Sequence, residues 1–390
     1  MSKGPLPFVI YSDGPGLPTG LARIARDLTE RLFAEQEALG ISVLQVGYDP
    51  TPHAPYPWPT YSAPTMDAEG DWGAGMVDHA WLGWFGNHAG VLFSVWDPGR
   101  SYPLLQVKGA EQRWGYFPVD AANVNGTLGG PAREAIQRYD RVLAYGRWGS
   151  QVLKPLRGEP VPYLPHGLDL DVWGYHHTPE ALARAEAIVQ PRQGEIIIGC
   201  VATNQPRKDL GLFFAALAEL RTRGLNVRGW LHTDRLVRSW SVQQLVSDFG
   251  LAKKVTVSLS LTDAELAACY SICGVTFAPG LGEGFGYPLV ESLACGTPVV
   301  HGDYGGGAEL VPMNAWKVPR VAERLESVYA LVRPVFRPED CANAVMRALD
   351  WKRNDHAVCQ AYCRGAVRHL GWDVLWPRWR SWFKQGLENY

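Results

Sequence analysis

The stretch that decides the fold is Glu283-Gly-Phe-Gly-Tyr-Pro-Leu-Val-Glu291, followed by Ser-Leu-Ala-Cys-Gly-Thr-Pro-Val-Val. Pro288 suits the first turn of a helix, Gly296 suits its C-terminal end, and Pro298 prevents the helix from continuing. The sequence therefore predicts a helix over 288–295, with a glycine-rich loop before it and an apolar strand after it.

Two carboxylates flank this loop: Glu283 lies before the predicted helix and Glu291 within its first turns. Gly284 and Gly286 let the backbone approach a ligand closely, and the N–H groups at the helix start favour an anionic or hydroxyl-rich partner. Carboxylates in such a place can accept hydrogen bonds from sugar hydroxyls. The alternative is that Glu291 only complements the helix dipole and the glycines only turn the chain.

Short apolar runs alternate with helical patterns on both sides of this stretch. The predicted strands of the first half are 8–11, 42–46, 91–96, 114–118, 141–145 and 161–164. Those of the second half are 195–201, 227–232, 255–259, 275–278 and 298–301, and further helices are predicted at 21–33, 178–189 and 209–223. This βαβ alternation is typical of an α/β protein with mostly parallel, doubly wound sheets.

A domain boundary is expected near residue 192, where an Ala-rich helix gives way to Gln-Pro-Arg-Gln-Gly and a new strand. The two domains are then 1–191 and 192–371. Residues 51–64 contain five prolines among aromatic residues and are predicted to form a loop, either contacting an acceptor or packed on the surface.

Composition excludes several classes of protein. The 390 residues are 46% hydrophobic and 19% charged, which argues against a disordered or fibrous chain. No apolar run approaches the roughly 20 residues that cross a bilayer, and the N-terminus lacks a signal-peptide core, so no membrane span and a cytoplasmic location are expected. The seven cysteines are interpreted as buried free thiols rather than a zinc site.

Charge is distributed unevenly along the sequence. Residues 1–190 hold 14 Lys and Arg against 20 Asp and Glu, whereas residues 191–390 hold 23 against 19. The resulting charges of -6 and +4 suggest two domains with different ligands.

The Glu-x7-Glu loop, with Gly-Phe-Gly inside it and Ala-Cys-Gly-Thr-Pro-Val-Val after it, resembles the signature of retaining glycosyltransferases of family 4. Further matches follow in the expected order: a glycine-rich segment at 14–20, Pro-His-Gly-Leu-Asp at 165–169, the pair Arg207-Lys208, and Gly-Gly-Gly-Ala-Glu at 305–309. The resemblance spans roughly residues 10–310. It implies the glycosyltransferase-B fold, in which two Rossmann-like domains face a cleft.

In that fold 1–191 is the acceptor-binding domain, 192–371 is the nucleotide-sugar donor domain, and the last helix, 372–390, crosses back to the first domain. The aromatic residues Trp372, Trp376, Trp379 and Phe383 recur on one helical face, although Pro377 is expected to kink or interrupt the helix. Burial against the first domain is the leading interpretation, and a nucleic-acid stacking surface flanked by arginines is the alternative.

The resemblance also implies roles for individual residues. Arg207 and Lys208 neutralise the donor diphosphate, and Glu291 holds the ribose hydroxyls. The family's sugar-binding loop corresponds here to Glu283, Gly284, Phe285, Gly286 and Tyr287. The early loop that reaches the phosphates corresponds to Gly16, Thr19 and Gly20. Retention is attributed to attack from the face of the departing diphosphate, which requires positioning and charge stabilisation more than a protein nucleophile. No DxD metal motif is present, and no cofactor is expected besides the nucleotide-sugar substrate.

The base is expected near Ser258–Leu261, which includes Ser260 and Leu261, with His232 bordering the nucleotide pocket. Where many family members carry a first-domain histidine near the reacting sugar, this chain reads Ser94-Val-Trp-Asp97. Asp97 is the preferred replacement because strand ends line the cleft, while His88 and a purely structural cap at Asp97 are alternatives. His166 either contacts phosphate between the domains or serves as a packing or hinge residue.

The acceptor, the sugar, the nucleotide and the oligomeric state stay open at this stage. Compact members of this family occur in phages, where the location is the host cytoplasm, and some modify hydroxymethylated DNA bases. A small molecule or a glycan fits the acidic first half better than DNA does. A nucleotide-sugar epimerase and a non-catalytic nucleotide-sugar-binding protein are the alternatives in other functional classes. Trp81, Trp84 and Trp96 are candidates for stacking on the acceptor.

Overall fold

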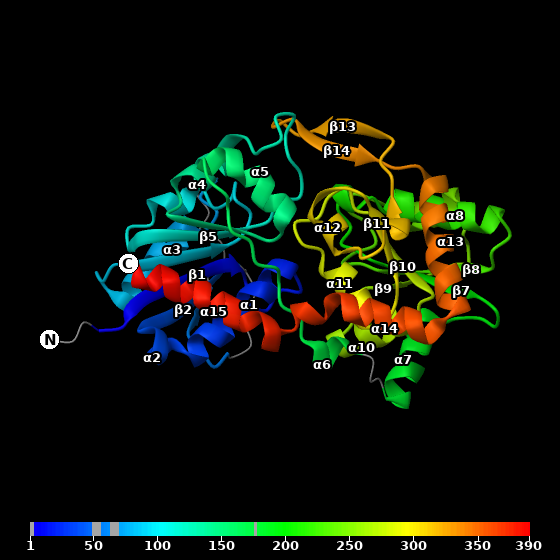
Figure 1. Ribbon diagram of the computed structural model, residues 1–390, viewed down its shortest axis with the longest axis horizontal. Helices are drawn as coiled ribbons and strands as arrows, with labels where there is room; N and C mark the ends of the chain where they lie inside the picture. Colours follow the sequence, from blue (N-terminus) through cyan, green and yellow to red (C-terminus); the bar gives the residue numbers. More distant parts are fainter. Residues whose placement is uncertain (1–3, 49–55, 63–69, 175–177) are drawn as a thin grey trace. The chain divides into compact units, whose positions relative to one another are not determined.

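The computed structural model describes residues 4–48, 56–62, 70–174 and 178–390 and divides the chain into two compact units. Unit 1 comprises Met1–Gly167 and Trp376–Tyr390, and unit 2 comprises Leu168–Leu375 (Figure 1). Each unit is built on a six-stranded sheet whose described strand pairs are all parallel. The prediction of two doubly wound α/β domains is confirmed.

The sheet of unit 1 has the strand order β3-β2-β1-β4-β5-β6. Its strands are β1 (Leu6–Asp13), β2 (Ile41–Tyr48), β3 (Thr60–Tyr61), β4 (Gly90–Val95), β5 (Ala110–Phe117) and β6 (Arg141–Ala144). The helices are α1 (Gly20–Ala34), α2 (Gln36–Leu39), α3 (Ala74–Phe85), α4 (Gly130–Arg138) and α5 (Arg147–Arg157). The strand predicted at 161–164 is reduced to one bridge, Ala144 to Tyr163, because Pro162 and Pro165 supply no backbone donors.

Residues 51–64 lie partly outside the described residues. Within the described part, the two-residue strand β3 pairs with β2, so the segment is not entirely a loop as predicted.

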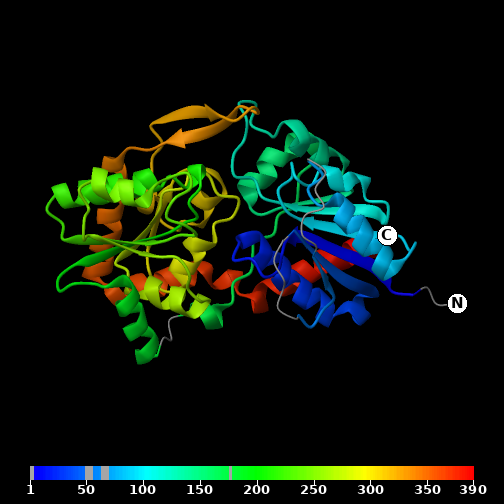
Figure 2. The same ribbon diagram turned by 180° about the vertical axis from the view of Figure 1, so that it is seen from behind.

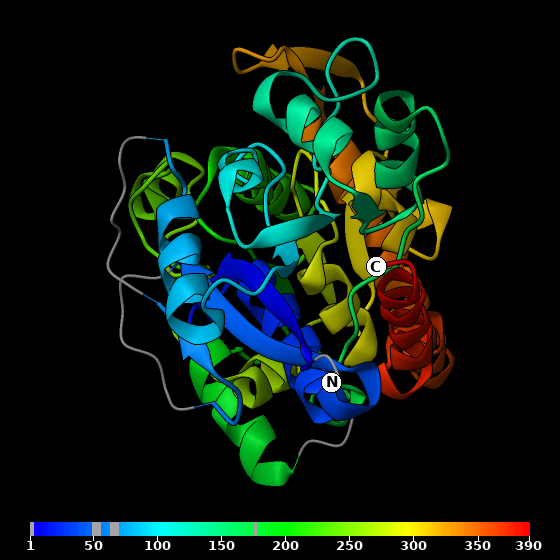
Figure 3. The same ribbon diagram turned by 90° about the vertical axis from the view of Figure 1, so that its left-hand side faces the viewer.

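Both faces of the unit 1 sheet are buried, because alternating residues of its strands point to opposite sides. Val9, Tyr11 and Leu92 pack with residues of α3 on one face. On the other, Phe8 and Phe93 contact Phe383 of α15 (Trp372–Glu388), with ring centroids 5.9 and 5.3 Å apart. Figure 3 shows α3 and the C-terminal helix on opposite sides of the strands of β1 and β2. This two-sided burial is typical of a parallel sheet.

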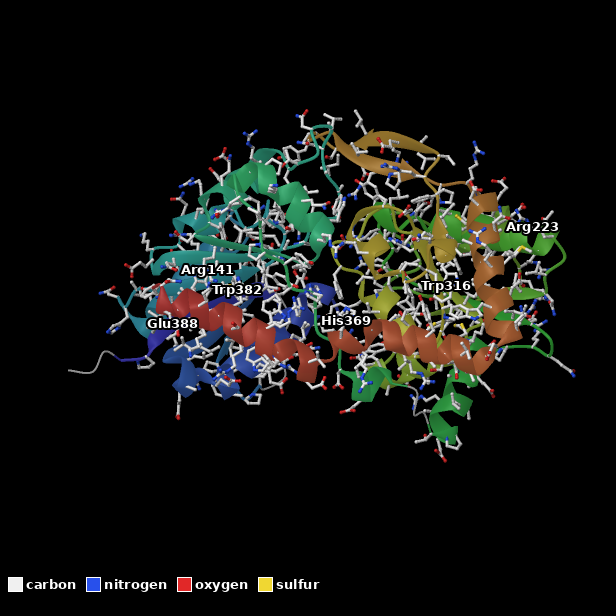
Figure 4. The ribbon with its side chains drawn as sticks, in the orientation of Figure 1. Arg141, Arg223, Trp316, His369, Trp382 and Glu388 are labelled. Carbon is white, nitrogen blue, oxygen red and sulfur yellow. The ribbon has the colours of Figure 1, made fainter. Side chains whose placement is uncertain are left out.

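The end of α15 is tied to unit 1 by more than apolar packing. The guanidinium of Arg141 lies 4.3 Å from the Trp382 ring centroid and donates a hydrogen bond of 3.0 Å to the Trp382 carbonyl (Figure 4). Trp376 and Arg380 both donate to the Glu35 carboxylate. The helix is not interrupted at Pro377: the fixed proline φ is compatible with a helix, and burial of the aromatic residues around it offsets one missing hydrogen bond.

Unit 2 has the strand order β12-β11-β10-β7-β8-β9. Its strands are β7 (Ile196–Val201), β8 (Val227–His232), β9 (Val255–Ser258), β10 (Val275–Ala278), β11 (Val299–Gly302) and β12 (Lys317–Val318), with a hairpin of β13 (Ala322–Glu326) and β14 (Leu331–Val335). Its main helices are α6 (Leu170–Trp173), α7 (Pro179–Val189), α8 (Leu210–Thr222), α9 (Val242–Asp248), α10 (Asp263–Ile272), α11 (Tyr287–Ala294), α12 (Gly305–Leu310), α13 (Pro338–Asn354) and α14 (His356–Val367). Figure 2 shows the same elements from behind.

The units divide between Gly167 and Leu168 and not near residue 191 as expected. Helix α7 packs on α10 in one core with β7 and β8, and Arg184 of α7 pairs with Glu265 of α10 at 2.5 Å. The Ala-rich pattern marks a helix, but nothing in its composition reveals which sheet it covers.

This division removes the charge asymmetry seen along the sequence. Counted over the structural units, unit 1 holds 16 Lys and Arg against 17 Asp and Glu, and unit 2 holds 21 against 22. Each unit therefore carries a formal charge of -1. The expectation of an acidic domain and a basic domain is wrong, because residues 168–190 bring four acidic residues to unit 2 and residues 376–390 bring three basic residues to unit 1.

All seven cysteines are free and buried. Within the described ranges, no helix is both long enough and apolar enough to cross a bilayer.

Candidate functional site

The carboxyl ends of the parallel strands of unit 2 meet at one edge of the sheet, where ligands bind in open α/β folds. A small pocket at this edge is lined by Val201 and Ala202 at the end of β7, and by Ala278, Pro279 and Gly280 at the end of β10. Its remaining walls are supplied by Lys208, Glu283, Gly286, Pro288 and Leu289. The pocket thus joins the predicted cation pair to the predicted glycine-rich loop.

An ion triad forms one side of this site. Lys208 Nζ lies 2.5 Å from Glu283 Oε1, and Arg207 Nη1 lies 3.3 Å from Glu283 Oε2. Burial opposes ionisation of Glu283, but the charges of Lys208 and Arg207 lower the pKa of its carboxyl to about 2. Two cations therefore face one carboxylate, which leaves the group with a net positive charge suited to an anionic ligand.

Backbone contacts hold the triad in place. Leu281 N donates to the Arg207 carbonyl at 2.7 Å, and Arg207 Nη1 donates to the Gly282 carbonyl at 3.1 Å. The cations sit in a short 3-10 turn, Pro206–Lys208, that follows β7, and Asp209 then caps α8. The strand-to-helix turn and the glycine-rich loop are consequently one structural unit.

Glycines are required at one point of the loop and at two points of α12, which packs against it. Gly286, with φ of 107°, is the N-cap of α11, a conformation that residues with side chains rarely adopt. A Cβ at Gly306 would lie 2.7 Å from the Gly284 carbonyl oxygen, and one at Gly307 would lie 2.6 Å from His301 Nε2. Phe285 and Tyr287 are buried and their rings contact each other at 5.5 Å. The glycine-rich segment at 305–307 therefore packs directly against the glycine-rich loop at 283–287.

Glu291 lies in the interior beneath this loop. It is buried, and Tyr270 of α10 donates a hydrogen bond of 3.1 Å to its Oε2. Glu291 does not line the small pocket. Of the predicted donor-site residues, Arg207, Lys208 and Glu283 are in direct contact with one another, and Glu291 is not among them.

His232 and Ser258 end the neighbouring strands of the same edge. They are register partners, and His232 Nδ1 lies 3.0 Å from Ser258 Oγ. The same oxygen accepts a hydrogen bond of 3.1 Å from Trp230 Nε1. Burial lowers the pKa of His232. Ser260 is exposed and Leu261 is half-buried in the loop before α10. These residues form a second group along the edge, on the other side of β7 from β10.

In unit 1 the predicted early loop is held by Asp13 at the end of β1. Thr19 is the N-cap of α1 and donates to Asp13 Oδ2 at 2.7 Å, while Trp96 Nε1 donates to Asp13 Oδ1 at 2.8 Å. Gly16 and Gly20 flank Thr19 and are exposed. Asp13 thus joins this loop to the end of β4.

Asp97 follows β4 at the carboxyl edge of this sheet. Its Oδ1 accepts hydrogen bonds from the N–H groups of Gly99 and Arg100, at 2.9 and 3.1 Å, so it caps a turn. His88 precedes β4 and therefore lies at the opposite, amino edge of the sheet. The alternative in which His88 takes the place of Asp97 is wrong for this reason.

His166 is buried in an aromatic cluster of unit 1. Its ring centroid lies 4.3 Å from that of Tyr145 and 5.5 Å from that of Tyr116, and burial lowers its pKa well below the ordinary value. These contacts favour the packing role over a phosphate contact. Trp81 and Trp96 are also buried, so their predicted stacking on an acceptor is wrong, whereas Trp84 is exposed.

Sequence reasoning missed three residues that shape the site of unit 2. Tyr270 contacts Glu291 from 21 positions away. His301 is buried beneath the loop, and its Nδ1 lies 2.8 Å from the Ala278 carbonyl. Asn204 donates to the carbonyls of Arg235 and Trp240 and thereby holds the loop after β8. None of the three belongs to a motif. No group of three or more metal-ligating side chains is found among the described residues.

Comparison with known proteins identifies the class to which this arrangement is related. Residues 184–350, which include the ion triad and Glu291, match the family described as glycosyl transferases group 1. The D-inositol 3-phosphate glycosyltransferase of Mycobacteroides abscessus is 30% identical over 203 residues, 52% of this chain and 41% of that protein. The MMP alpha-(1->4)-mannosyltransferase of Mycolicibacterium hassiacum is 34% identical over 127 residues, 32% of this chain and 30% of that protein.

Solved structures match over nearly the whole chain. Sucrose-phosphate synthase from Thermosynechococcus elongatus gives a TM-score of 0.72 at 18% identity, covering 99% of this chain and 100% of that one. HepE of Anabaena in complex with UDP-glucose gives 0.69 at 14% identity, with coverage of 99% and 100%. At these identities the likeness shows the fold, which is that of glycosyltransferase-B proteins. The matched regions span less than two thirds of the length of these curated relatives, and they support a relationship to the group 1 glycosyltransferases.

Proposed function

We propose that the protein is a retaining glycosyltransferase that transfers a sugar from a nucleoside diphosphate sugar to an acceptor hydroxyl without a metal ion. The observation that carries the proposal is the convergence of Arg207 and Lys208 on Glu283 at the carboxyl edge of the sheet, inside the region that matches group 1 glycosyltransferases. A net positive group in a small pocket suits the diphosphate of such a donor.

Donor binding would exchange partners within the triad. The diphosphate oxygens take up the cations of Arg207 and Lys208, which frees the Glu283 carboxylate to accept hydrogen bonds from hydroxyls of the transferred sugar. Glu291, beneath the loop, holds the ribose hydroxyls. Asp97 takes the role of the family's first-domain group that contacts the reacting sugar. Its Oδ1 accepts the two hydrogen bonds of the turn.

The reaction proceeds on one face of the sugar. The bond between the anomeric carbon and the diphosphate oxygen breaks while the acceptor oxygen bonds to the same carbon, and the acceptor proton passes to the departing phosphate. The cation pair stabilises the negative charge that develops on the leaving group, and the site supplies position more than a nucleophile.

The test is a panel of uridine, guanosine, adenosine and thymidine diphosphate sugars, each with a polyol, a glycan or hydroxymethylated duplex DNA as acceptor. Release of nucleoside diphosphate and the product mass are measured, and NMR of the product gives its anomeric configuration. Lys208→Ala and Glu291→Ala should each reduce turnover by at least about a hundredfold. Lys253→Ala, an exposed lysine at the amino edge of the same sheet, is the matched control and should retain activity.

Turnover that survives both site substitutions would refute the site assignment. An epimerised donor formed without acceptor would identify an epimerase, and binding without turnover of any donor would identify a nucleotide-sugar-binding protein. Each unit carries the same formal charge, so charge no longer argues against DNA as the acceptor. Binding of duplex DNA is therefore measured at several salt concentrations alongside the other acceptors.

A further inference from the structure

His301 is buried beside the ion triad and has no role in the proposed function. It lies in β11, and its side chain is fully buried. A Cβ at Gly307 would lie 2.6 Å from His301 Nε2 and 3.2 Å from Glu283 Cβ. A Cβ at Gly280 would lie 3.7 Å from His301 Cε1 and 2.8 Å from Glu283 Oε1. The imidazole and the triad carboxylate therefore border the same two glycines and lie next to each other.

The hydrogen bonds of His301 define the state of one ring nitrogen and leave the other without a partner. Nδ1 lies 2.8 Å from the carbonyl oxygen of Ala278, which can only accept, so Nδ1 carries a proton in the neutral and in the charged imidazole. Nε2 is buried and has no hydrogen-bond partner among the described residues. In the neutral ring Nε2 is unprotonated, and it is the atom at which the ring can take up a second proton.

The ring is held neutral in the protein without a donor. Burial lowers the pKa of His301, and this effect outweighs the Ala278 carbonyl and the charge of Glu283, which both raise it. The charge of Lys208 lowers the pKa, and that of Asp303 raises it. A neutral ring suits a triad in which two cations already face one carboxylate.

Donor binding would reverse the balance of charge around the ring. The triad has one surplus positive charge, because Arg207 and Lys208 face the single carboxylate of Glu283. The diphosphate of a nucleotide sugar brings two negative charges, so the occupied site has one negative charge in excess. An uncompensated charge at a buried site is costly, and nearby negative charge favours the protonated form of an imidazole.

The other charged groups on the elements around His301 cannot supply the missing charge. Asp303 follows β11 and Glu309 lies on α12, and both are acidic and exposed. Lys317 of β12 is the register partner of His301, and as a lysine it carries its charge before the donor binds. His301 is therefore the neighbour of Glu283 that can gain a positive charge near neutral pH.

We infer that His301 is a positioning residue for donor binding: when the diphosphate takes the two cations of the triad, a proton from solvent binds at His301 Nε2, and the imidazolium keeps the Glu283 carboxylate ionised and in place for the sugar hydroxyls. No covalent bond between heavy atoms changes in this step, and the solvent loses the proton that the imidazole gains. The inference rests on the proposed function.

The first experiment is isothermal titration calorimetry of UDP-glucose, GDP-mannose, ADP-glucose and dTDP-glucose in PIPES and in imidazole buffer, between about pH 6 and 7.5. These donors have no phosphate group that titrates in this range, unlike free nucleoside diphosphates. The difference in binding enthalpy between the two buffers gives the number of protons exchanged. For a donor that binds, uptake of about half a proton to one proton per site is expected, because His301 is neutral before binding and charged after it.

Substitutions separate this role of His301 from mere packing. His301→Asn keeps an amide N–H near the position of Nδ1 but cannot take up a proton, and His301→Gln is a second variant that cannot titrate. The affinity of the wild type should fall as the pH rises, by up to about tenfold per pH unit, whereas both variants should bind without proton uptake and with nearly constant affinity. A purely structural role would lower the affinity equally at every pH. His369→Gln, on an exposed histidine of unit 2 (Figure 4), is the matched control and should keep the wild-type uptake.

The outcomes that would overturn the inference are release of protons, no exchange in the wild type, or uptake that is unchanged in both His301 variants. Uptake that is lost in His232→Gln and kept in His301→Asn would assign the proton to the other histidine of this edge and would also overturn it. If donor affinity depends on Lys208 but no proton is taken up, only the inference fails. If no donor binds to the wild type, the proposed function fails with it.

Discussion

Replacement of Glu283 by glutamine tests how much the ion triad contributes to the fold and how that contribution depends on pH. The carboxyl has a pKa of about 2 in the folded protein against an ordinary value of 4.5, because Lys208 and Arg207 stabilise its charge despite burial. A folded-state pKa below the unfolded value means that the stabilisation is present in full above about pH 4.5 and is lost as the pH falls toward 2.

The size of the effect follows from the shift. A difference of 4.5 to about 2 corresponds to about 3 kcal/mol of unfolding free energy at neutral pH, at about 1.4 kcal/mol per pKa unit. Of this, about 1–2 kcal/mol is lost between pH 7 and pH 3.5. Over this pH range the unfolding free energy of the wild type should fall by that much more than that of Glu283→Gln. The variant has no carboxyl to titrate at this position, so it shows only the pH dependence of the rest of the protein.

The assay is urea-induced unfolding of both proteins, followed by tryptophan fluorescence, at several pH values from 7 to 3.5. Glu323→Gln, which removes an exposed carboxylate paired with Arg320 on the hairpin, is the control and should follow the wild type. A difference between wild type and Glu283→Gln that stays constant over this range would refute the reasoning, as would equal stability at pH 7.

Three further predictions concern stability and packing. Glu195→Gln should destabilise unit 2 by about 3–5 kcal/mol in urea unfolding, because it leaves Arg228, 2.6 Å from that carboxylate and equally buried, without its charged partner; a loss below about 1 kcal/mol would contradict this. Gly306→Ala should raise the KM for the donor, because the new Cβ displaces the glycine-rich loop at 283–287. Gly365→Ala, in open space on α14, is the control and should leave the KM unchanged. Equal KM values in both variants would contradict the claim that the loop position depends on glycine at 306. Trp379→Ala should cost about 3–5 kcal/mol in thermal or urea unfolding, since the side chain is fully buried in unit 1, and wild-type stability would mean that the C-terminal helix does not contribute to that core.

The parallel sheets could be predicted from the sequence because buried parallel strands are short, apolar and separated by helical patterns. The ends of β8 and β10 fall where the sequence predicts them. The boundary between the units could not be placed, because α7 carries an ordinary amphipathic pattern and only its contacts with α10 show which unit it joins. The same contacts changed the charge balance on which the acceptor argument depended.

Within the candidate site, the motif located Arg207, Lys208 and Glu283 but not their mutual ion pairs, because residues 75 positions apart meet only through the sheet topology. Asp97 was predicted at a strand end, with a structural cap as one alternative, and its Oδ1 does cap a turn there. The tryptophans of the first unit illustrate the opposite case. Trp81 of α3 and Trp96 after β4 fit both a binding surface and a core in the sequence, and their burial shows that they belong to the core.

The central claim is that the cation pair of unit 2 binds the diphosphate of a nucleotide donor. It is tested most directly by calorimetric titration of nucleoside diphosphates into the wild type, Lys208→Ala and the exposed-lysine control Lys253→Ala. The account predicts that at least one nucleoside diphosphate binds to the wild type and to the control with the same affinity, and at least about tenfold more weakly to Lys208→Ala. Equal affinity for all three proteins, or no binding to the wild type, would contradict it.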